Sequence, residues 1–193
     1  MLAGYLRSLG VDLVTTREPG GTPLGRRLRE AFLETEETVA PMAELLAFAA
    51  DRAQHVEFLI RPSIAAGRLV ISDRYADATA AYQGAGRGFD KKSVEQVIAL
   101  ATGGLKPDLT LFLDISVDEA VRRMAARDEA LSVRNRMDEE TFDFYARVRA
   151  EYLAIAKREP GRFHVIDAAD AVEAVQSKVV SVVAAKFDLL HVQ

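Results

Sequence analysis

The chain has 193 residues, of which 49% are hydrophobic and 28% are charged, and its formal net charge is −4. A chain of this length and apolar content can bury one substantial core, which argues against a disordered or fibrous protein. The acidic balance argues against a general nucleic-acid or membrane-surface binder, because both classes depend on an excess of basic residues.

The absence of cysteine excludes disulfides and thiolate metal sites. The three histidines, His55, His164 and His191, are too scattered along the chain to suggest a metal cluster, so no metal ligand is assigned. No run approaches the roughly 20 apolar residues that a membrane-spanning helix needs, and the first residues lack the pattern of a signal peptide. We therefore expect a protein of the reducing cytoplasm with no membrane or nucleic-acid partner.

Short apolar runs alternate along the chain with longer segments of helical periodicity. A first helix ends at Gly10 and a strand over 11–16 follows it, after which Thr22 can cap a helix that begins at Pro23. The other expected strands are 68–72, 109–114 and 163–167. The other expected helices cover about 41–60, 76–83, 91–102 and 117–128, a segment that ends near 158, and a last one from about 171.

This alternation of strand and helix predicts an α/β fold. Because the strands read as nearly continuous apolar runs, we expect a parallel sheet with helices on both faces. In such a sheet, ligands bind beyond the carboxyl ends of the strands. Polar residues stand at all four of these ends: "REPGGT" (17–22), Asp73-Arg74-Tyr75, Asp114 and "DAAD" (167–170). The sequence therefore predicts a binding site at this edge of the sheet.

Two pairs of residues near these ends allow a functional and a structural interpretation. The planar fork of Arg74 suits a phosphate, but Arg74 and Asp73 could also form a structural ion pair at the rim. Phe48 and Arg52 lie four residues apart and share a helix face. Phe48 alone could belong to the core, whereas an aromatic face beside a guanidinium donor suits an aromatic base that bears a carbonyl.

Two basic segments remain open in the same way. Arg87 in "GAGRG" (84–88) could approach an anion, although most glycine-rich loops are only turns. Arg127, Arg134 and Arg136 lie in a polar stretch between helices. Such a stretch is usually a solvated face, but mobile basic segments also serve as lids over transferring phosphates.

Taken together, the motifs resemble bacterial thymidylate kinases over nearly the whole chain. The segments that carry the resemblance, in the family's order and spacing, are "TREPGGTPLG", "LLAFAADRAQHVEFLIRP", "VISDRYADATAAYQGAGRG", "PDLTLFLD", "RNRMDEETFDFYARVRAEYL" and "VIDA". The resemblance implies a P-loop-kinase-like fold, one domain over 1–193 and a lid at about 127–140. It also implies a cytoplasmic homodimer that transfers the γ-phosphoryl group of ATP to dTMP with Mg²⁺, giving dTDP for dTTP synthesis.

The resemblance assigns roles to residues that match the family's motifs. Phe48 would stack on thymine and Arg52 would hydrogen-bond its carbonyl edge, while Thr79 and Gln83 would face the base. The residues implied at the sugar and monophosphate are Glu18, Arg29 and Arg74. The residues expected to act on the transferring phosphate are Asp73, Arg74, Arg134 and Arg136, with Arg127 as a further lid contact to ATP.

The printed sequence departs from the family at one motif. The family has a strand followed by a P-loop, roughly G-x-x-G-x-G-K-[ST], whose N–H groups and lysine hold the ATP phosphates. No such motif occurs here, no lysine precedes Lys91, and "MLAGYLRSLG" resembles the end of the helix that follows the P-loop. We expect a start assigned too far downstream and a sheet without its central strand. The alternatives are a truncated, non-catalytic nucleotide-binding homologue and a deoxynucleoside kinase.

Overall fold

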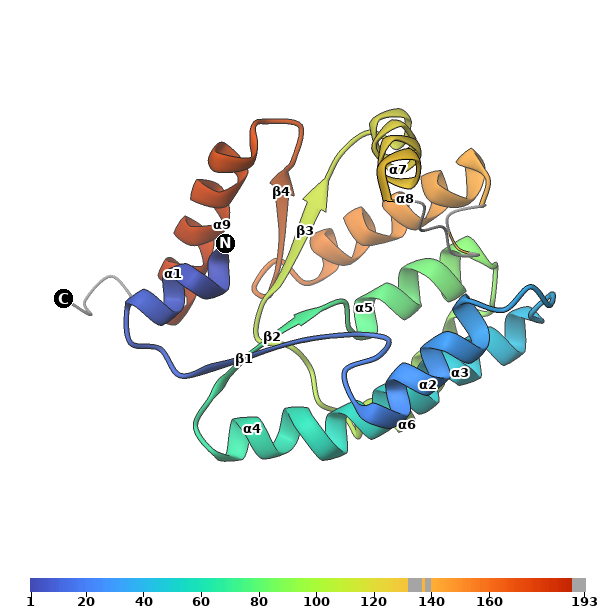
Figure 1. The fold of residues 1–193 in the computed structure, drawn as a ribbon, viewed down its shortest axis with the longest axis horizontal. Coiled ribbons are helices and arrows are strands. Elements are labelled where there is room, and N and C mark those ends of the chain that lie inside the picture. Colours follow the sequence, from blue (N-terminus) through green and yellow to red (C-terminus); the bar gives the residue numbers. More distant parts are fainter. Residues whose placement is uncertain (132–136, 138–139, 189–193) are drawn as a thin grey trace.

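Four short strands form the centre of the protein in the computed structural model, which describes residues 1–131, 137 and 140–188. The strands are β1 (Leu13–Arg17), β2 (Leu69–Asp73), β3 (Thr110–Asp114) and β4 (Phe163–Asp167). β1 pairs in parallel with β2, and β3 pairs in parallel with β4, with Leu13 opposite Leu69 and Thr110 opposite Phe163. Within the described residues the two pairs are separate sheets, since β2 and β3 do not pair. The sequence predicted parallel strands, and both pairs are parallel (Figure 1).

Helical segments connect and surround these strands. They are α1 (Leu2–Ser8), α2 (Pro23–Leu33), α3 (Pro41–His55), η1 (Val56–Ile60), α4 (Arg61–Ala65), α5 (Ala76–Thr79), η2 (Ala80–Gly86), α6 (Lys91–Thr102), α7 (Val117–Leu131), α8 (Phe142–Arg158) and α9 (Val172–Phe187). α2 begins as predicted, because the Thr22 hydroxyl accepts the Gly25 N–H at 3.0 Å and Pro23 occupies the first helical position.

Helices cover both faces of the strands, as predicted. On one face α1 and α9 pack on the sheets, and the core there consists of Leu6, Leu13, Ile166, Val179 and Val183. On the other face α8 packs on β3 and β4, where the rings of Phe112 and Tyr152 stack with centroids 4.6 Å apart. Figure 1 shows α9 and α8 on opposite sides of β3 and β4. The α/β architecture therefore follows from strands whose alternate side chains face two helical layers.

Two segments depart from the predicted helices and loops. The predicted long helix over 41–60 continues as the π-helical turn η1 and then as α4. The predicted "GAGRG" loop is wrong up to Gly86, because η2 extends to that residue as a π-helix. A Cβ at Gly86 would lie 2.6 Å from Cε2 of Phe144. Glycine thus lets the end of η2 pack directly against α8.

A second core lies between α2, α3, η2 and α8. Its buried apolar members are Phe32, Leu33, Phe48, Ala81, Met137, Phe144 and Val148. Rings meet edge-on within it, as in the pair of Phe32 and Phe48 with centroids 4.9 Å apart. This core holds α3 and η2 in fixed positions beyond the carboxyl ends of β1 and β2.

Candidate functional site

A pocket lies at the carboxyl ends of β1 and β2, where the sequence predicted a binding site. Its lining residues are Glu18, Phe48, Arg52, Arg74, Ala78, Thr79, Tyr82 and Gln83. Glu18 and Arg74 follow strands β1 and β2, while the others come from α3, α5 and η2. The structure thus brings together six of the seven residues predicted for the substrate, from segments far apart in the chain. The seventh, Arg29, lies on α2 beside the same loop.

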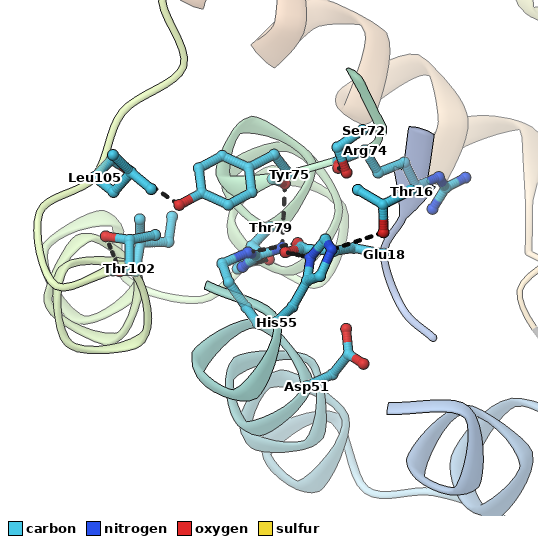
Figure 2. A network of polar contacts seen from close by, with 12 residues as sticks. Thr16, Glu18, Asp51, His55, Ser72, Arg74, Tyr75, Thr79, Thr102 and Leu105 are labelled. Atoms are coloured by element: carbon cyan, nitrogen blue, oxygen red, sulfur yellow. Dashed lines mark hydrogen bonds and ion pairs between the residues drawn. The ribbon is translucent and has the colours of Figure 1, made fainter. Parts of the chain in front are cut away.

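A buried carboxylate, Glu18, organises one wall of the pocket. Glu18 is 4% exposed and accepts the Nε–H of Arg52 at 2.8 Å through Oε2. Its Oε1 lies 2.8 Å from Nδ1 of His55, whose Nε2 lies 2.7 Å from the Thr16 hydroxyl (Figure 2). Hydrogen bonds to the remaining atoms stabilise a buried ion pair, and here both carboxylate oxygens of Glu18 have a partner. Glu18 therefore fixes the position of Arg52.

Arg52 keeps unused donors for a ligand. Its NH1 donates to the Thr79 hydroxyl at 2.8 Å and its NH2 donates to the Tyr75 carbonyl at 3.1 Å. A guanidinium has five N–H groups. Within the described residues, Glu18, Thr79 and Tyr75 do not use all of them. Because the Thr79 oxygen accepts from Arg52, the Thr79 O–H group also remains able to donate.

Phe48 is both a core residue and a pocket wall. Its side chain is 8% exposed and packs on Phe32, yet its ring lines the pocket. The two interpretations that the sequence left open for Phe48 are therefore compatible. A flat aromatic wall of this kind suits the face of a ring-shaped ligand.

Arg74 adopts an unusual backbone conformation at the end of β2. Its φ is 70°, a left-handed conformation that costs a non-glycine residue about 1 to 2 kcal/mol. The Ser72 hydroxyl donates to its carbonyl at 2.8 Å, and its guanidinium lies over the Tyr82 ring, 4.7 Å from the centroid. No ion pair joins Asp73 to Arg74, both of which are described, so the predicted alternative of such a pair is not what the structure has. Arg74 is held by Tyr82 and stays available to an anion.

Three arginines, Arg17, Arg29 and Arg74, lie near one another around the "REPGG" loop. A Cβ at Gly20 would lie 3.4 Å from Cδ of Arg29 and 3.9 Å from Nε of Arg17. Burial, followed by the charge of Arg17, lowers the pKa of Arg29, and Arg74 acts in the same direction. A second hollow, next to this loop, is lined by Thr15, Thr16, Arg17, Gly20 and Gly21. Like charges held this close make the loop a favourable place for an anionic group.

Glycine allows the "REPGG" loop to lie directly on α3. A Cβ at Gly21 would come within 2.5 Å of Nε2 of His55 and 2.7 Å of the Thr16 hydroxyl. The Gly20 N–H donates to Oδ1 of Asp51 at 3.0 Å. The loop that carries Glu18 is thus fastened to the helix that carries Arg52.

Asp51 supplies a pH-dependent test of this attachment. The residue is fully buried, its Oδ2 has no hydrogen-bond partner among the described residues, and burial raises its pKa. A carboxyl whose pKa is raised by folding stabilises the protein below its unfolded pKa, and this advantage is lost as the pH rises through the folded value. We expect Asp51→Asn, which has no charge to bury, to gain about 1 kcal/mol of stability relative to the unaltered protein as the pH rises above about 4, the ordinary pKa of a carboxyl.

Urea unfolding at a series of pH values measures this difference. Asp90→Asn is the matched control, because Asp90 caps α6 and the Ser93 N–H lowers its pKa. Its difference from the unaltered protein should change with pH in the opposite direction. A pH-independent difference for Asp51→Asn would contradict the expected burial of a titrating carboxyl.

Some predicted residues lie beyond what the structure describes, and some important ones were not predicted. Arg134 and Arg136 lie outside the described residues, as does the side chain of Arg127, so their roles stay predictions. Sequence reasoning assigned no individual role to the buried partners Glu44, Asp51 and His55, the pocket residue Tyr82 or the loop residue Arg17. The spacing of "DRAQH" on one helix face was the available signal for Asp51 and His55.

No group of three or more histidine, aspartate and glutamate side chains is arranged to hold a metal ion within the described ranges. None of the helices in this part of the chain combines the length and apolar character that crossing a bilayer requires.

Comparison with known proteins gives a consistent result. Residues 1–179 match the family model described as thymidylate kinase. The chain is 47% identical over 178 residues to a thymidylate kinase of Desulfovibrio desulfuricans, covering 90% of this chain and 82% of that protein. It is 46% identical over 186 residues to one of Thermomicrobium roseum, covering 93% and 87%. The crystal structure of thymidylate kinase from Ehrlichia chaffeensis superposes with a TM-score of 0.75 at 35% identity, covering 94% of this chain and 87% of that one.

Proposed function

The chain belongs to the thymidylate kinase family, and on this basis we propose that it transfers the γ-phosphoryl group of ATP to dTMP with Mg²⁺. A phosphate oxygen of dTMP forms the new bond to the γ-phosphorus, the bond to the β-phosphate oxygen breaks, and dTDP and ADP result. The observation that carries the proposal is a pocket lined by an aromatic ring, by polar side chains and by Arg74, with Arg17 and Arg29 beside the adjoining "REPGG" loop.

The base end of the pocket suits thymine. Phe48 offers its ring face, and the unused N–H groups of Arg52 suit a ring carbonyl. Thr79 and Gln83 stand beside them with a hydroxyl and an amide. A mostly apolar slot with a few placed polar groups is typical of small-molecule recognition.

The phosphate end of the pocket suits a phosphomonoester. Arg74 stands at the pocket wall, and Arg17 and Arg29 lie beside the loop that follows β1. Catalysis of phosphoryl transfer consists mainly of positioning and charge stabilisation, which guanidinium groups supply. Arg127, Arg134 and Arg136 of the proposed lid, about 127–140, would add positive charge from the ATP side.

The residues present are compatible with Mg²⁺ carried by ATP. Mg²⁺ in kinases is usually bound by one or two carboxylates together with substrate phosphates, so it does not need a cluster of protein ligands. Asp73 is exposed at the end of β2 and is the carboxylate that would hold the ion there. Bound in this way, Mg²⁺ offsets the negative charge of the transferring phosphate.

A homodimer of the cytoplasm is part of the proposal. Met42 and Leu46 on α3 are 50% and 53% exposed, and Leu100 on α6 is 84% exposed. α3 packs against α6, so these apolar side chains belong to neighbouring helices. Exposed apolar side chains on adjoining helices are typical of a surface that a second copy covers.

Titration calorimetry tests the proposed substrate. We expect the 193-residue chain to bind dTMP more tightly than dUMP by about 1 to 3 kcal/mol, the usual value of one methyl-sized contact in a pocket. Thymidine, which lacks the phosphate, should bind more weakly than dTMP because the three arginines then have no anion. No binding of dTMP, or equal binding of dUMP, would refute the assignment. Equal binding of thymidine and dTMP would instead favour the deoxynucleoside kinase.

A further inference from the structure

A buried carboxylate, Glu44, lies directly behind the pocket without lining it. Glu44 is on the first turn of α3 and is 0% exposed. Its Oε1 accepts Nε2 of Gln83 at 2.9 Å and Nε of Arg87 at 3.1 Å, and its Oε2 accepts NH2 of Arg87 at 2.9 Å. Arg87 also pairs with Glu140 at 2.6 Å. The sequence left open whether Arg87 contacts an external anion. In the structure Arg87 binds the carboxylates of Glu44 and Glu140 instead.

These contacts determine which way the Gln83 amide points. An ionised carboxylate can only accept hydrogen bonds, and the two-pronged contact with Arg87 favours the ionised form of Glu44. Gln83 must therefore turn its NH₂ group toward Glu44 and its carbonyl oxygen, Oε1, the other way. Gln83 is 2% exposed and lines the pocket, and within the described residues no group donates to Oε1. The amide thus offers an acceptor to a ligand.

The pocket therefore offers both hydrogen-bond donors and a hydrogen-bond acceptor to a ligand. Arg52 and Thr79 keep N–H and O–H groups, and Gln83 offers a carbonyl oxygen. A pyrimidine with a 4-carbonyl and an N3–H group has the complementary pattern. A 4-aminopyrimidine has a donor at position 4 and an unprotonated N3, so it places donor against donor and acceptor against acceptor. Unpaired polar groups in a closed pocket discriminate strongly between such ligands.

We propose that Glu44 is a positioning residue that fixes the Gln83 amide and thereby makes the pocket select 4-oxopyrimidine nucleotides over 4-aminopyrimidine nucleotides. Arg87 supports this role by keeping Glu44 ionised. The inference rests on the proposed dTMP site and adds to it a residue that does not touch the base. Without Glu44, the two amide orientations of Gln83 become similar in energy, and the pocket can meet either base.

Calorimetric titration of Glu44→Leu with dTMP and dCMP tests the proposal. We expect the affinity ratio of dTMP to dCMP to fall at least about tenfold relative to the unaltered protein, because one hydrogen-bonding mismatch is removed. Glu44→Gln should restore only part of the ratio, because one end of its amide can accept from Gln83 but its NH₂ group then faces the N–H groups of Arg87. A loss of affinity for both nucleotides at an unchanged ratio would show a merely structural role and overturn the proposal.

Two further measurements keep the outcomes distinct. Asp77→Asn is the control, because Asp77 forms a mostly buried ion pair with Arg162 at 2.7 Å and does not line the pocket. It should leave the ratio unchanged. If Glu44→Leu does not fold, the orientation of the Gln83 amide can be measured by NMR in the unaltered protein, labelled with ¹⁵N-glutamine and bound to dTMP. The signal of Gln83 is the one that disappears in Gln83→Asn. Contacts of the Gln83 amide protons with Glu44 support the proposal, and contacts with the base overturn it. If the unaltered protein binds no dTMP, the proposed function fails first.

Discussion

Supplying a strand and a G-x-x-G-x-G-K-[ST] loop ahead of Met1 should raise dTMP phosphorylation at least about a thousandfold over that of the 193-residue chain. The printed sequence contains no such loop. In phosphoryl transfer, the N–H groups and the lysine of this loop fix the triphosphate and neutralise its charge. Without the loop, arginines elsewhere in the protein have no fixed phosphate to contact. The segment can be taken from a member of the family that carries it.

The arrangement of the strands gives this extension a place to pair. Among the described residues β2 pairs only with β1 and β3 only with β4, so each has an edge with free N–H and C=O groups. A coupled assay of ADP release on both forms measures the effect, with circular dichroism to check folding. The matched control carries the same extension with its loop lysine changed to alanine, and it should lose most of the gain. Comparable dTMP-dependent turnover with and without the extension would show that the loop is dispensable.

Replacing Arg74 by alanine should lower kcat/KM for dTMP by about a thousandfold in the extended, active form. The free energy of unfolding should change by no more than about 1 kcal/mol, because Arg74 stacks on Tyr82 but closes no ion pair with Asp73. A group that stabilises charge at the transferring phosphate acts on turnover more than on folding. Steady-state kinetics and urea unfolding on the same preparation separate the two effects.

Arg68→Ala is a suitable control for Arg74→Ala. Arg68 is an exposed arginine just before β2, so it stands at the opposite end of the same strand from Arg74. Its loss should leave kcat/KM nearly unchanged. Near-native turnover of Arg74→Ala with an unchanged KM would make Arg74 a structural residue.

The strands and helix starts could be predicted from the sequence because the signals for them lie within each segment. The apolar run "FHVID" (163–167) coincides with β4, and Thr22 and Pro23 begin α2 where capping chemistry predicts. The π-helical form of η2 was missed, because it depends on packing against Phe144, 58 residues after Gly86. Periodicity within a segment carries no information about such a distant neighbour.

The position of the candidate site and most of its lining residues could be predicted, but the buried residues that support it could not. The rule that ligands bind at the carboxyl ends of parallel strands located it, and the motif resemblance supplied six of its lining residues. The buried support could not be read in this way, because Glu18 and Arg52 are 34 positions apart and Glu44 and Gln83 are 39 apart. Such pairings form only when the chain folds, and the sequence marks them no differently from solvated charges.

The π-helical geometry of η2 limits how this pocket can diverge among related proteins. Removing a single residue from its wide turn would let the segment continue as an α-helix, in which each residue advances by about 100°. Gly84 would then take the position of Gln83, and the side chain that we propose meets the base would be lost together with its contact to Glu44. Substitutions can change the chemistry of this wall one group at a time, whereas insertions and deletions within 80–86 change its register all at once. We therefore expect a change in the number of residues in η2 to disturb the pocket more than a single substitution within it.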